Sequence, residues 1–97
     1  MLEPGEIVVM KGTFLYDGTV ECDIRIVFSP ICYGSGDYED PEELREDQQV
    51  DNYYIQYGST TNRDTFGGRV GCYPSLEEAT AEAVEGSAIG PTIKWLD

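Results

Sequence analysis

Carboxylate side chains are concentrated in two short segments of this chain, and any chemistry it performs has to involve them. Residues 37–51 contain eight carboxylates and one basic residue, which gives this segment a net charge of −7. Residues 75–85 contain four carboxylates and no basic residue, for a net charge of −4. Together the two segments supply −11 of the total net charge of −13. This clustering predicts an acidic surface that would attract a basic partner.

The side chains that we assign to a partner-binding surface come from both acidic segments and from the strand that follows the first. Tyrosine is enriched at protein interfaces, and a carboxylate beside an aromatic ring suits arginine or lysine. Tyr54 is expected to face outward, because it alternates with Tyr53 and Tyr57, which would point into the core. The alternative is that Tyr53 and Tyr57 belong to the core, with their hydroxyls reaching water, and that the tyrosines form no binding surface with the carboxylates. The predicted partner-binding residues are Asp37, Tyr38, Glu39, Asp40, Glu42, Glu43, Glu46, Asp47, Tyr54, Glu78, Glu82 and Glu85.

The composition argues against most kinds of catalysis. The chain contains no histidine, the commonest general base and the commonest zinc ligand. Pairs of carboxylates can act as acid and base, but a chain with 19 of them contains many pairs and none stands out. Residues 67–71 lack the Lys-Ser/Thr ending of a phosphate-binding loop, and residues 37–51 lack the spacing of an EF-hand. We therefore expect a protein that is not an enzyme and has no cofactor or bound metal.

The three cysteines, Cys22, Cys32 and Cys72, allow one disulfide bond at most within the chain. The first residues lack the basic and apolar regions of a signal peptide, and no stretch approaches the roughly 20 apolar residues that span a bilayer. These features favour a cytoplasmic protein with reduced cysteines. A net charge of −13 would repel nucleic acid and anionic membranes, so we expect direct binding to neither.

The first elements that position the acidic segments are the two strands of a predicted β-hairpin. Residues 6–16 and 19–28 are rich in β-branched and aromatic residues and are separated by an Asp-Gly pair, a strong signal for a two-residue turn. Such a turn places Lys11 opposite the apolar Ile24, so we expect a β-bulge at Gly12 that turns Lys11 outward. The other pairs that this turn predicts are Leu15–Val20, Val9–Ile26 and Ile7–Phe28.

The remaining elements carry the acidic segments themselves. A first helix is predicted over residues 40–48, where an Asp-Pro-Glu-Glu sequence is typical of a helix start. A second helix is predicted over residues 76–85, capped by Ser75 and ended by Gly86, with small buried side chains that include Ala79. Further strands are predicted at residues 50–57, 69–73 and 92–96.

These elements follow one another in the order β-β-α-β-β-α-β and predict a single α+β domain over residues 1–97. We expect a mostly antiparallel sheet of about five strands. The second helix would pack on one sheet face, and the first would be a short surface helix. The other sheet face would be open or lightly covered.

The leading functional hypothesis is a non-enzymatic acidic binding protein that docks on a basic surface of a partner protein. In its sharpest form, the carboxylates imitate the phosphates of nucleic acid and the chain inhibits a nucleic-acid-binding protein. The alternative is a small-molecule-binding domain that uses the open sheet face, with Phe14, Tyr16 and Trp95 lining a groove. A small assembly subunit, such as a homodimer formed through a sheet edge, is the third hypothesis.

Overall fold

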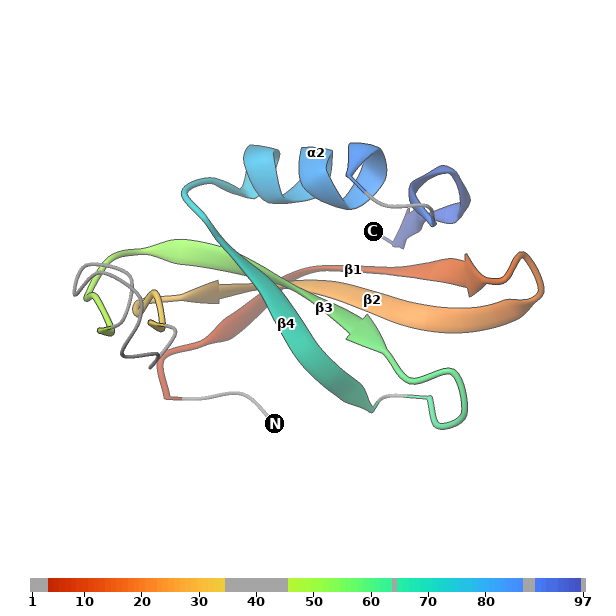
Figure 1. The fold of residues 1–97 in the computed structure, drawn as a ribbon, viewed down its shortest axis with the longest axis horizontal. Coiled ribbons are helices and arrows are strands. Elements are labelled where there is room, and N and C mark those ends of the chain that lie inside the picture. Colours follow the sequence, from red (N-terminus) through yellow and green to blue (C-terminus); the bar gives the residue numbers. More distant parts are fainter. Residues whose placement is uncertain (1–3, 35–45, 64, 87–88, 97) are drawn as a thin grey trace.

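The computed structural model describes residues 4–34, 46–63, 65–86 and 89–96, and these form a five-stranded sheet with one α-helix (Figure 1). Every strand pair is antiparallel, and the strand order is β4-β3-β2-β1-β5. The predicted α+β class is confirmed. The elements are β1 (Ile7–Tyr16), β2 (Val20–Ser29), β3 (Asn52–Gly58), β4 (Phe66–Tyr73), α2 (Leu76–Glu85), the 3-10 helix η1 (Gly90–Thr92) and β5 (Lys94–Leu96).

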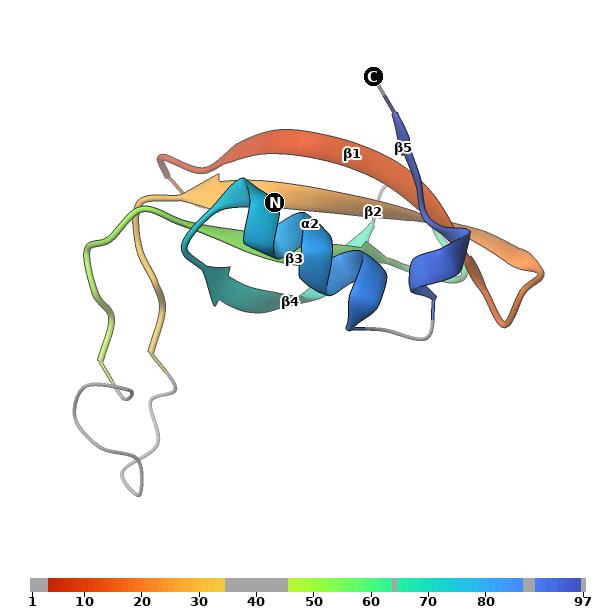
Figure 2. The ribbon, with the colours of Figure 1, turned by 90° about the horizontal axis from the view of Figure 1, so that it is seen from above.

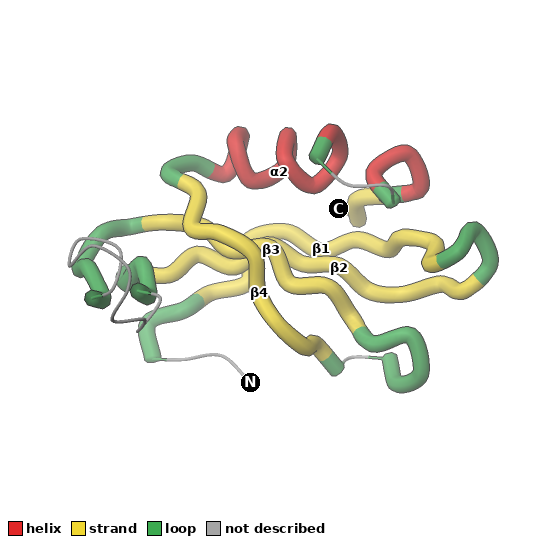
Figure 3. The backbone as a smooth tube through the Cα atoms, in the orientation of Figure 1, coloured by secondary structure: helices red, strands yellow, loops and turns green. Residues whose placement is uncertain are grey.

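Helix α2 covers one face of the sheet, and no described helix lies on the opposite face (Figure 3). The helix follows β4, at one edge of the sheet, and leads through η1 to β5, at the other edge. Along this path α2 contacts β2, β3 and β4. Viewed from above, the helix lies over the middle of the sheet and β5 lies beside β1 (Figure 2). One helical crossover therefore connects the two edges of the sheet.

The turn between β1 and β2 sets the register of this hairpin. It contains three residues, one more than predicted, because Tyr16 pairs with Val20. Its first residue, Asp17, has a φ of 52°, a left-handed conformation that asparagine and aspartate tolerate better than most residues. The extra turn residue shifts the pairing by one position, so the predicted pair Leu15–Val20 is wrong and Leu15 lies opposite Glu21.

A β-bulge at Val9 compensates for the longer turn. Val9 has no partner in β2, so its predicted pairing with Ile26 is wrong. Beyond the bulge the register returns to the predicted one, and Ile7 lies opposite Phe28. The bulge was predicted at Gly12, and the structure places it three residues earlier. A bulge was needed in either case, because without it the side chains of one strand end would face the wrong side of the sheet.

Between the turn and the bulge, the register creates a polar row across the face opposite α2. Lys11 lies opposite Arg25, Arg25 opposite Gln56, and Gln56 opposite Arg69. Leu96 of β5 lies opposite Lys11 and completes the row at the other edge. Residues directly opposite each other on neighbouring strands share one face of a sheet. Three basic side chains are thus collected on the sheet face that carries no described helix.

Helix α2 has the boundaries and caps that its sequence predicts. The hydroxyl of Ser75 accepts a hydrogen bond from the backbone N–H of Glu78 at 3.1 Å, and the helix ends at Gly86. Ala79 and Ala83 are fully buried against the sheet. Because these side chains are small, the helix backbone can approach the strands closely. The carboxylates of the helix lie on its other, exposed side.

The hydrophobic core lies between α2 and the sheet. Trp95 is half-buried and packs against its edge, so neither Trp95 nor Phe14 lines the open face, as the small-molecule hypothesis required. Tyr16, the third residue assigned to that groove, is exposed near the end of β1. The core consists of Phe14, Cys22, Ile24, Ile26, Ile55, Ala79 and Ala83.

Other predicted boundaries need correction. The predicted first helix falls largely outside the described residues, and its described end, residues 46–48, is not helical. Instead, the backbone of Gln48 pairs with Cys32 in an isolated β-bridge. Strand β4 begins at Phe66, three residues before its predicted start, and β5 begins only at Lys94, because η1 occupies residues 90–92.

The pairing of β1 with β5 depends on the absence of a side chain at Gly12. A Cβ atom there would lie 2.6 Å from the carbonyl oxygen of Lys94 and 3.0 Å from the ring of Trp95. We expect Gly12→Ala to lower the free energy of unfolding by about 1–3 kcal/mol, because the two strands would have to separate. Urea unfolding followed by the fluorescence of Trp95 measures this change.

Gly67→Ala is the matched control for this variant. Gly67 also lies in a strand, and a Cβ atom added there would meet no atom within 4 Å. We expect its stability to stay close to that of the parent protein. Equal losses in the two variants would contradict the close approach of β5 to Gly12.

Candidate functional site

The exposed side of α2 carries a row of carboxylates. Glu78, Glu82 and Glu85 are exposed and, together with Tyr73 and Ala81, line a shallow depression of about 230 Å³. None of the lysine and arginine side chains in the described part of the chain forms an ion pair with these carboxylates. The structure thus brings three of the predicted partner-binding residues together on one rigid element.

Tyr73, the last residue of β4, is a neighbour of this row that was not predicted. Burial raises the pKa of its phenol, and the negative charge of Glu82 and the proximity of Tyr57 raise it further. The phenol therefore keeps its proton at neutral pH and can donate a hydrogen bond beside the carboxylates. The sequence does contain a signal, because Tyr73 lies two residues before the helix cap Ser75 and must lie near the first helical turn.

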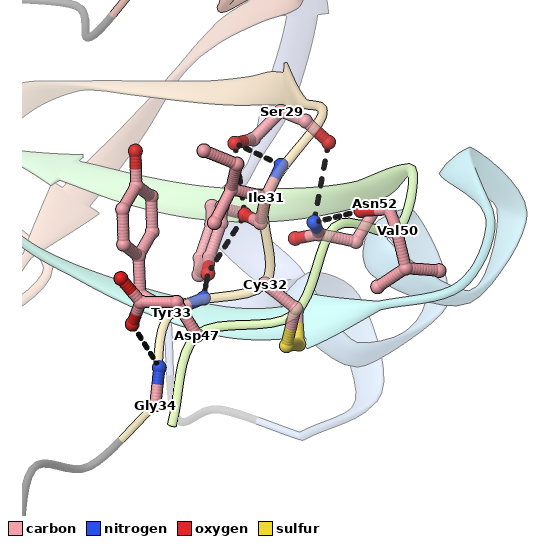
Figure 4. The surroundings of a disulfide bond; sticks show 10 residues. Ser29, Ile31, Cys32, Tyr33, Gly34, Asp47, Val50 and Asn52 are labelled. Carbon is pink, nitrogen blue, oxygen red and sulfur yellow. Dashed lines mark hydrogen bonds between the residues drawn. A yellow bond between two sulfur atoms is a disulfide. The ribbon is translucent and has the colours of Figure 1, made fainter. Parts of the chain in front are cut away.

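Only two of the predicted residues of the first acidic segment are described. Glu46 and Asp47 are exposed, and the carboxylate of Asp47 accepts a hydrogen bond from the backbone N–H of Gly34 at 2.8 Å (Figure 4). This bond lies next to the bridge between Cys32 and Gln48, whose two backbone hydrogen bonds measure 2.8 and 2.9 Å. Asp37, Tyr38, Glu39, Asp40, Glu42 and Glu43 lie outside the described residues.

A disulfide bond connects the bases of the two acidic segments. Cys32 is bonded to Cys72, 40 residues later in the chain, with a Cα–Cα distance of 5.8 Å (Figure 4). This separation is typical of disulfides. The prediction that all cysteines are reduced is therefore wrong for this pair, whereas Cys22 is free and fully buried. Because Cys72 lies three residues before Ser75, the bond connects Cys32, and through the β-bridge Gln48, to the part of the chain that leads into α2.

The disulfide should contribute strongly to stability. Closing a loop of this length in the unfolded chain is worth about 4 kcal/mol in the chain-entropy model. We expect the reducing agent TCEP, or the variant Cys32→Ser with Cys72→Ser, to lower the melting temperature by more than about 10 °C. Cys22→Ser without TCEP is the comparison that retains the bond. Thiol counting after denaturation without reductant should find one free thiol, and a count of three would contradict the bond.

Tyr54 alternates with the core-facing residues of β3 as predicted, but it is only 4% exposed, so the prediction that it is accessible on the outside is wrong. Its hydroxyl accepts a hydrogen bond from the backbone N–H of Tyr33 at 2.8 Å and donates one to the carbonyl of Ile31 at 3.5 Å. The guanidinium of Arg69 lies 4.8 Å from the centre of its ring. Tyr54 therefore holds the chain that follows β2 against the sheet, and its hydroxyl is not available to a partner.

A buried ion pair lies beside Tyr54 on this second face of the sheet. Two nitrogens of Arg69 donate to the two carboxylate oxygens of Glu6, at 2.7 and 3.0 Å, and the Glu6 side chain has no solvent exposure. These hydrogen bonds are the main reason that the pKa of Arg69 is raised. The two residues are 63 positions apart and neither belongs to a motif, so the sequence contains no signal for the pair.

Removing one partner of this buried pair should lower the stability of the protein more than breaking an ion pair at an exposed side chain. We expect Glu6→Gln to lower the free energy of unfolding by about 1–3 kcal/mol, because the charge of Arg69 then loses its counter-ion in a half-buried position. The control is Arg63→Gln, which removes an exposed guanidinium paired with Glu21 and Asp23 and should lower the free energy of unfolding less than Glu6→Gln does. Urea unfolding of both variants measures the difference, and a larger loss in the control would contradict the assignment.

In the described part of the chain, no three or more metal-ligating side chains lie close enough together to hold an ion, and no helix is both long enough and apolar enough to cross a bilayer. Comparisons with models of protein families, with curated proteins and with solved structures found no match to this chain.

Proposed function

We propose that this chain is a non-enzymatic binding protein that docks on a basic surface of a partner protein through the carboxylates of α2. The supporting observation is that Glu78, Glu82 and Glu85 are exposed on a rigid helix without a counter-ion among the described residues. Tyr73 adds a neutral phenol to the same depression. This combination matches what an arginine or lysine side chain binds.

The spacing of these carboxylates supports the idea that they imitate nucleic-acid phosphates. With a rise of about 1.5 Å per residue, the helix presents roughly one carboxylate every 5 Å between Glu78 and Glu85. A DNA strand presents one phosphate about every 3.4 Å along its axis. The acidic row is thus somewhat less dense than one strand of DNA. We propose a partner that normally binds nucleic acid and that this chain inhibits by competing for the same cleft.

The first acidic segment would extend this surface. Glu46 and Asp47 lie at its described base, which the bridge between Cys32 and Gln48 and the disulfide between Cys32 and Cys72 connect to the chain that leads into α2. We therefore include Asp37, Tyr38, Glu39, Asp40, Glu42 and Glu43 in the proposed partner-binding surface.

Two further elements of the proposal concern assembly and compartment. A homodimer through a sheet edge stays a prediction, and β5 offers only three residues for such pairing. A cytoplasmic location also stays a prediction. The disulfide weighs against it, because disulfide bonds are rare in a reducing cytoplasm.

The test uses a basic partner captured at about 50 mM salt, purified, and titrated with matched variants. We expect Glu78→Gln with Glu82→Gln and Glu85→Gln to weaken binding by about tenfold or more, since three lost charge contacts of about 0.5 kcal/mol each amount to roughly that factor. The parent protein should also displace a labelled DNA duplex from the partner. Its affinity should fall steeply between about 50 and 200 mM salt.

The matched control changes net charge equally at a distant place. Lysines introduced in the β3–β4 loop, in the variant Thr60→Lys with Asn62→Lys and Thr65→Lys, also make the net charge three units less negative, and all three positions are exposed. We expect this control to keep most of the affinity. Equal weakening in both variants would mean that net charge alone is responsible, and it would contradict docking through α2.

The contribution of the first acidic segment is tested separately. We expect Glu42→Lys with Glu43→Lys, Glu46→Lys and Asp47→Lys to abolish binding to the same partner, because four attractive charges become repulsive. Circular dichroism of this variant checks that the fold is retained. Unchanged binding by the folded variant would remove the segment from the proposed surface.

A further inference from the structure

The sheet face opposite α2 contains an open cavity of about 230 Å³ that combines basic and apolar side chains. Its lining residues come from the β1–β2 hairpin, from the start of β4 and from the end of β5, and Lys11 and Arg25 place it on the face without a described helix. Cavities of roughly 150 Å³ can hold a benzene ring, so this volume suffices for a ring with one small substituent. The lining residues are Lys11, Gly12, Asp23, Ile24, Arg25, Phe66 and Leu96.

Arg25 is held in place at this cavity by two neighbours. Its Nε donates a hydrogen bond to the side-chain oxygen of Gln56 at 2.6 Å, and its guanidinium lies 4.0 Å from the centre of the Phe66 ring. No described side chain accepts a hydrogen bond from its two terminal nitrogens. A guanidinium that is oriented from one side and free on the other is suited to bind a planar carboxylate with two parallel hydrogen bonds.

Lys11 adds a second positive charge at the same cavity. It lies directly opposite Arg25 on the neighbouring strand, is exposed, and forms no ion pair with a described carboxylate. Burial lowers the pKa of Arg25, and the positive charge of Arg69 lowers it further, with an opposing effect from Glu6. The positive charges on this face are therefore incompletely compensated, although the net charge of the protein is −13. An anion between Lys11 and Arg25 would compensate them.

The nearby carboxylates already have partners, which reduces their repulsion of an anion. Asp23 lines the cavity, but it accepts hydrogen bonds from Arg63 at 2.6 and 3.0 Å. Glu6 is bound to Arg69. Each of these acids is thus neutralised by a cation that does not line the cavity.

An apolar depression continues from the cavity along β1. It has a volume of about 330 Å³, and it shares Lys11 and Leu96 with the first cavity. Its other lining residues are Val8, Val9 and Met10. A ligand whose charged end lies at Arg25 could therefore extend an apolar body along this side or against Phe66.

We propose that the face opposite α2 binds a small organic carboxylate, with its carboxylate between Lys11 and Arg25 and its ring or hydrocarbon body against Phe66 and Leu96. The charge complementarity of the two basic residues selects an anion, and the small volume selects a small molecule over a peptide or nucleic acid. This site does not depend on the docking function of α2, because it lies on the other face of the sheet and uses side chains of opposite charge.

The experiment uses the full chain and benzoate as the probe, with neutral benzamide as its matched analogue. We expect benzoate to bind with a dissociation constant in roughly the millimolar range, about tenfold or more tighter than benzamide. Two-dimensional NMR should show the largest shifts at Lys11, Arg25 and Phe66. Phenyl phosphate and inorganic phosphate are tested as further ligands in the same experiment, and both should bind more weakly than benzoate.

Variants of the two basic residues test whether their charges bind the carboxylate. Lys11→Met and Arg25→Gln should each weaken benzoate binding by about tenfold or more, whereas Lys94→Met should leave it unchanged. Lys11 is exposed, so its variant remains informative even if the Arg25 variant is unstable. The proposal is overturned if benzoate and benzamide bind equally, if inorganic phosphate alone matches benzoate, or if Lys11→Met and Lys94→Met have the same effect.

Discussion

The pairing register of β1 and β2 decides which side chains share each face of the sheet. A three-residue turn shifts this register by one position, and the bulge at Val9 shifts it back. Between these two irregularities, Lys11 faces Arg25 while alternate residues supply the core. A strand that slips by one residue exchanges its two faces, so the core and the basic row both depend on the same two local features.

The result is a molecule whose two sides differ in the charges that have no ion-pair partner among the described residues. The solvent side of α2 presents carboxylates, and the opposite sheet face presents Lys11, Arg25 and Arg69. Within the second face, Arg69 is committed to the buried carboxylate of Glu6, whereas Lys11 and Arg25 border a cavity. The two proposed binding surfaces therefore differ in charge, in shape and in the size of the partner that they can accommodate.

The sequence predicted what local patterns determine. Helix α2 was correctly bounded because Ser75 and Gly86 cap it and small residues such as Ala79 mark its buried side. The predictions that were wrong concern contacts between segments that are distant in the sequence. Tyr54 alternates correctly with core residues, but the chain after β2 folds over it, so the second face is partly buried as well. The pairing of Cys32 with Cys72 and that of Glu6 with Arg69 likewise leave no local pattern, because each joins residues at least 40 positions apart.

The thiol of Cys22 can report how often α2 separates from the sheet. Its thiol is free, has no solvent exposure, and lies in the core between α2 and the sheet. An alkylating reagent can reach such a sulfur only when the helix lifts from the strands or the whole domain unfolds. The rate at which Cys22 is alkylated under native conditions therefore measures how often this layer opens, without any engineered label.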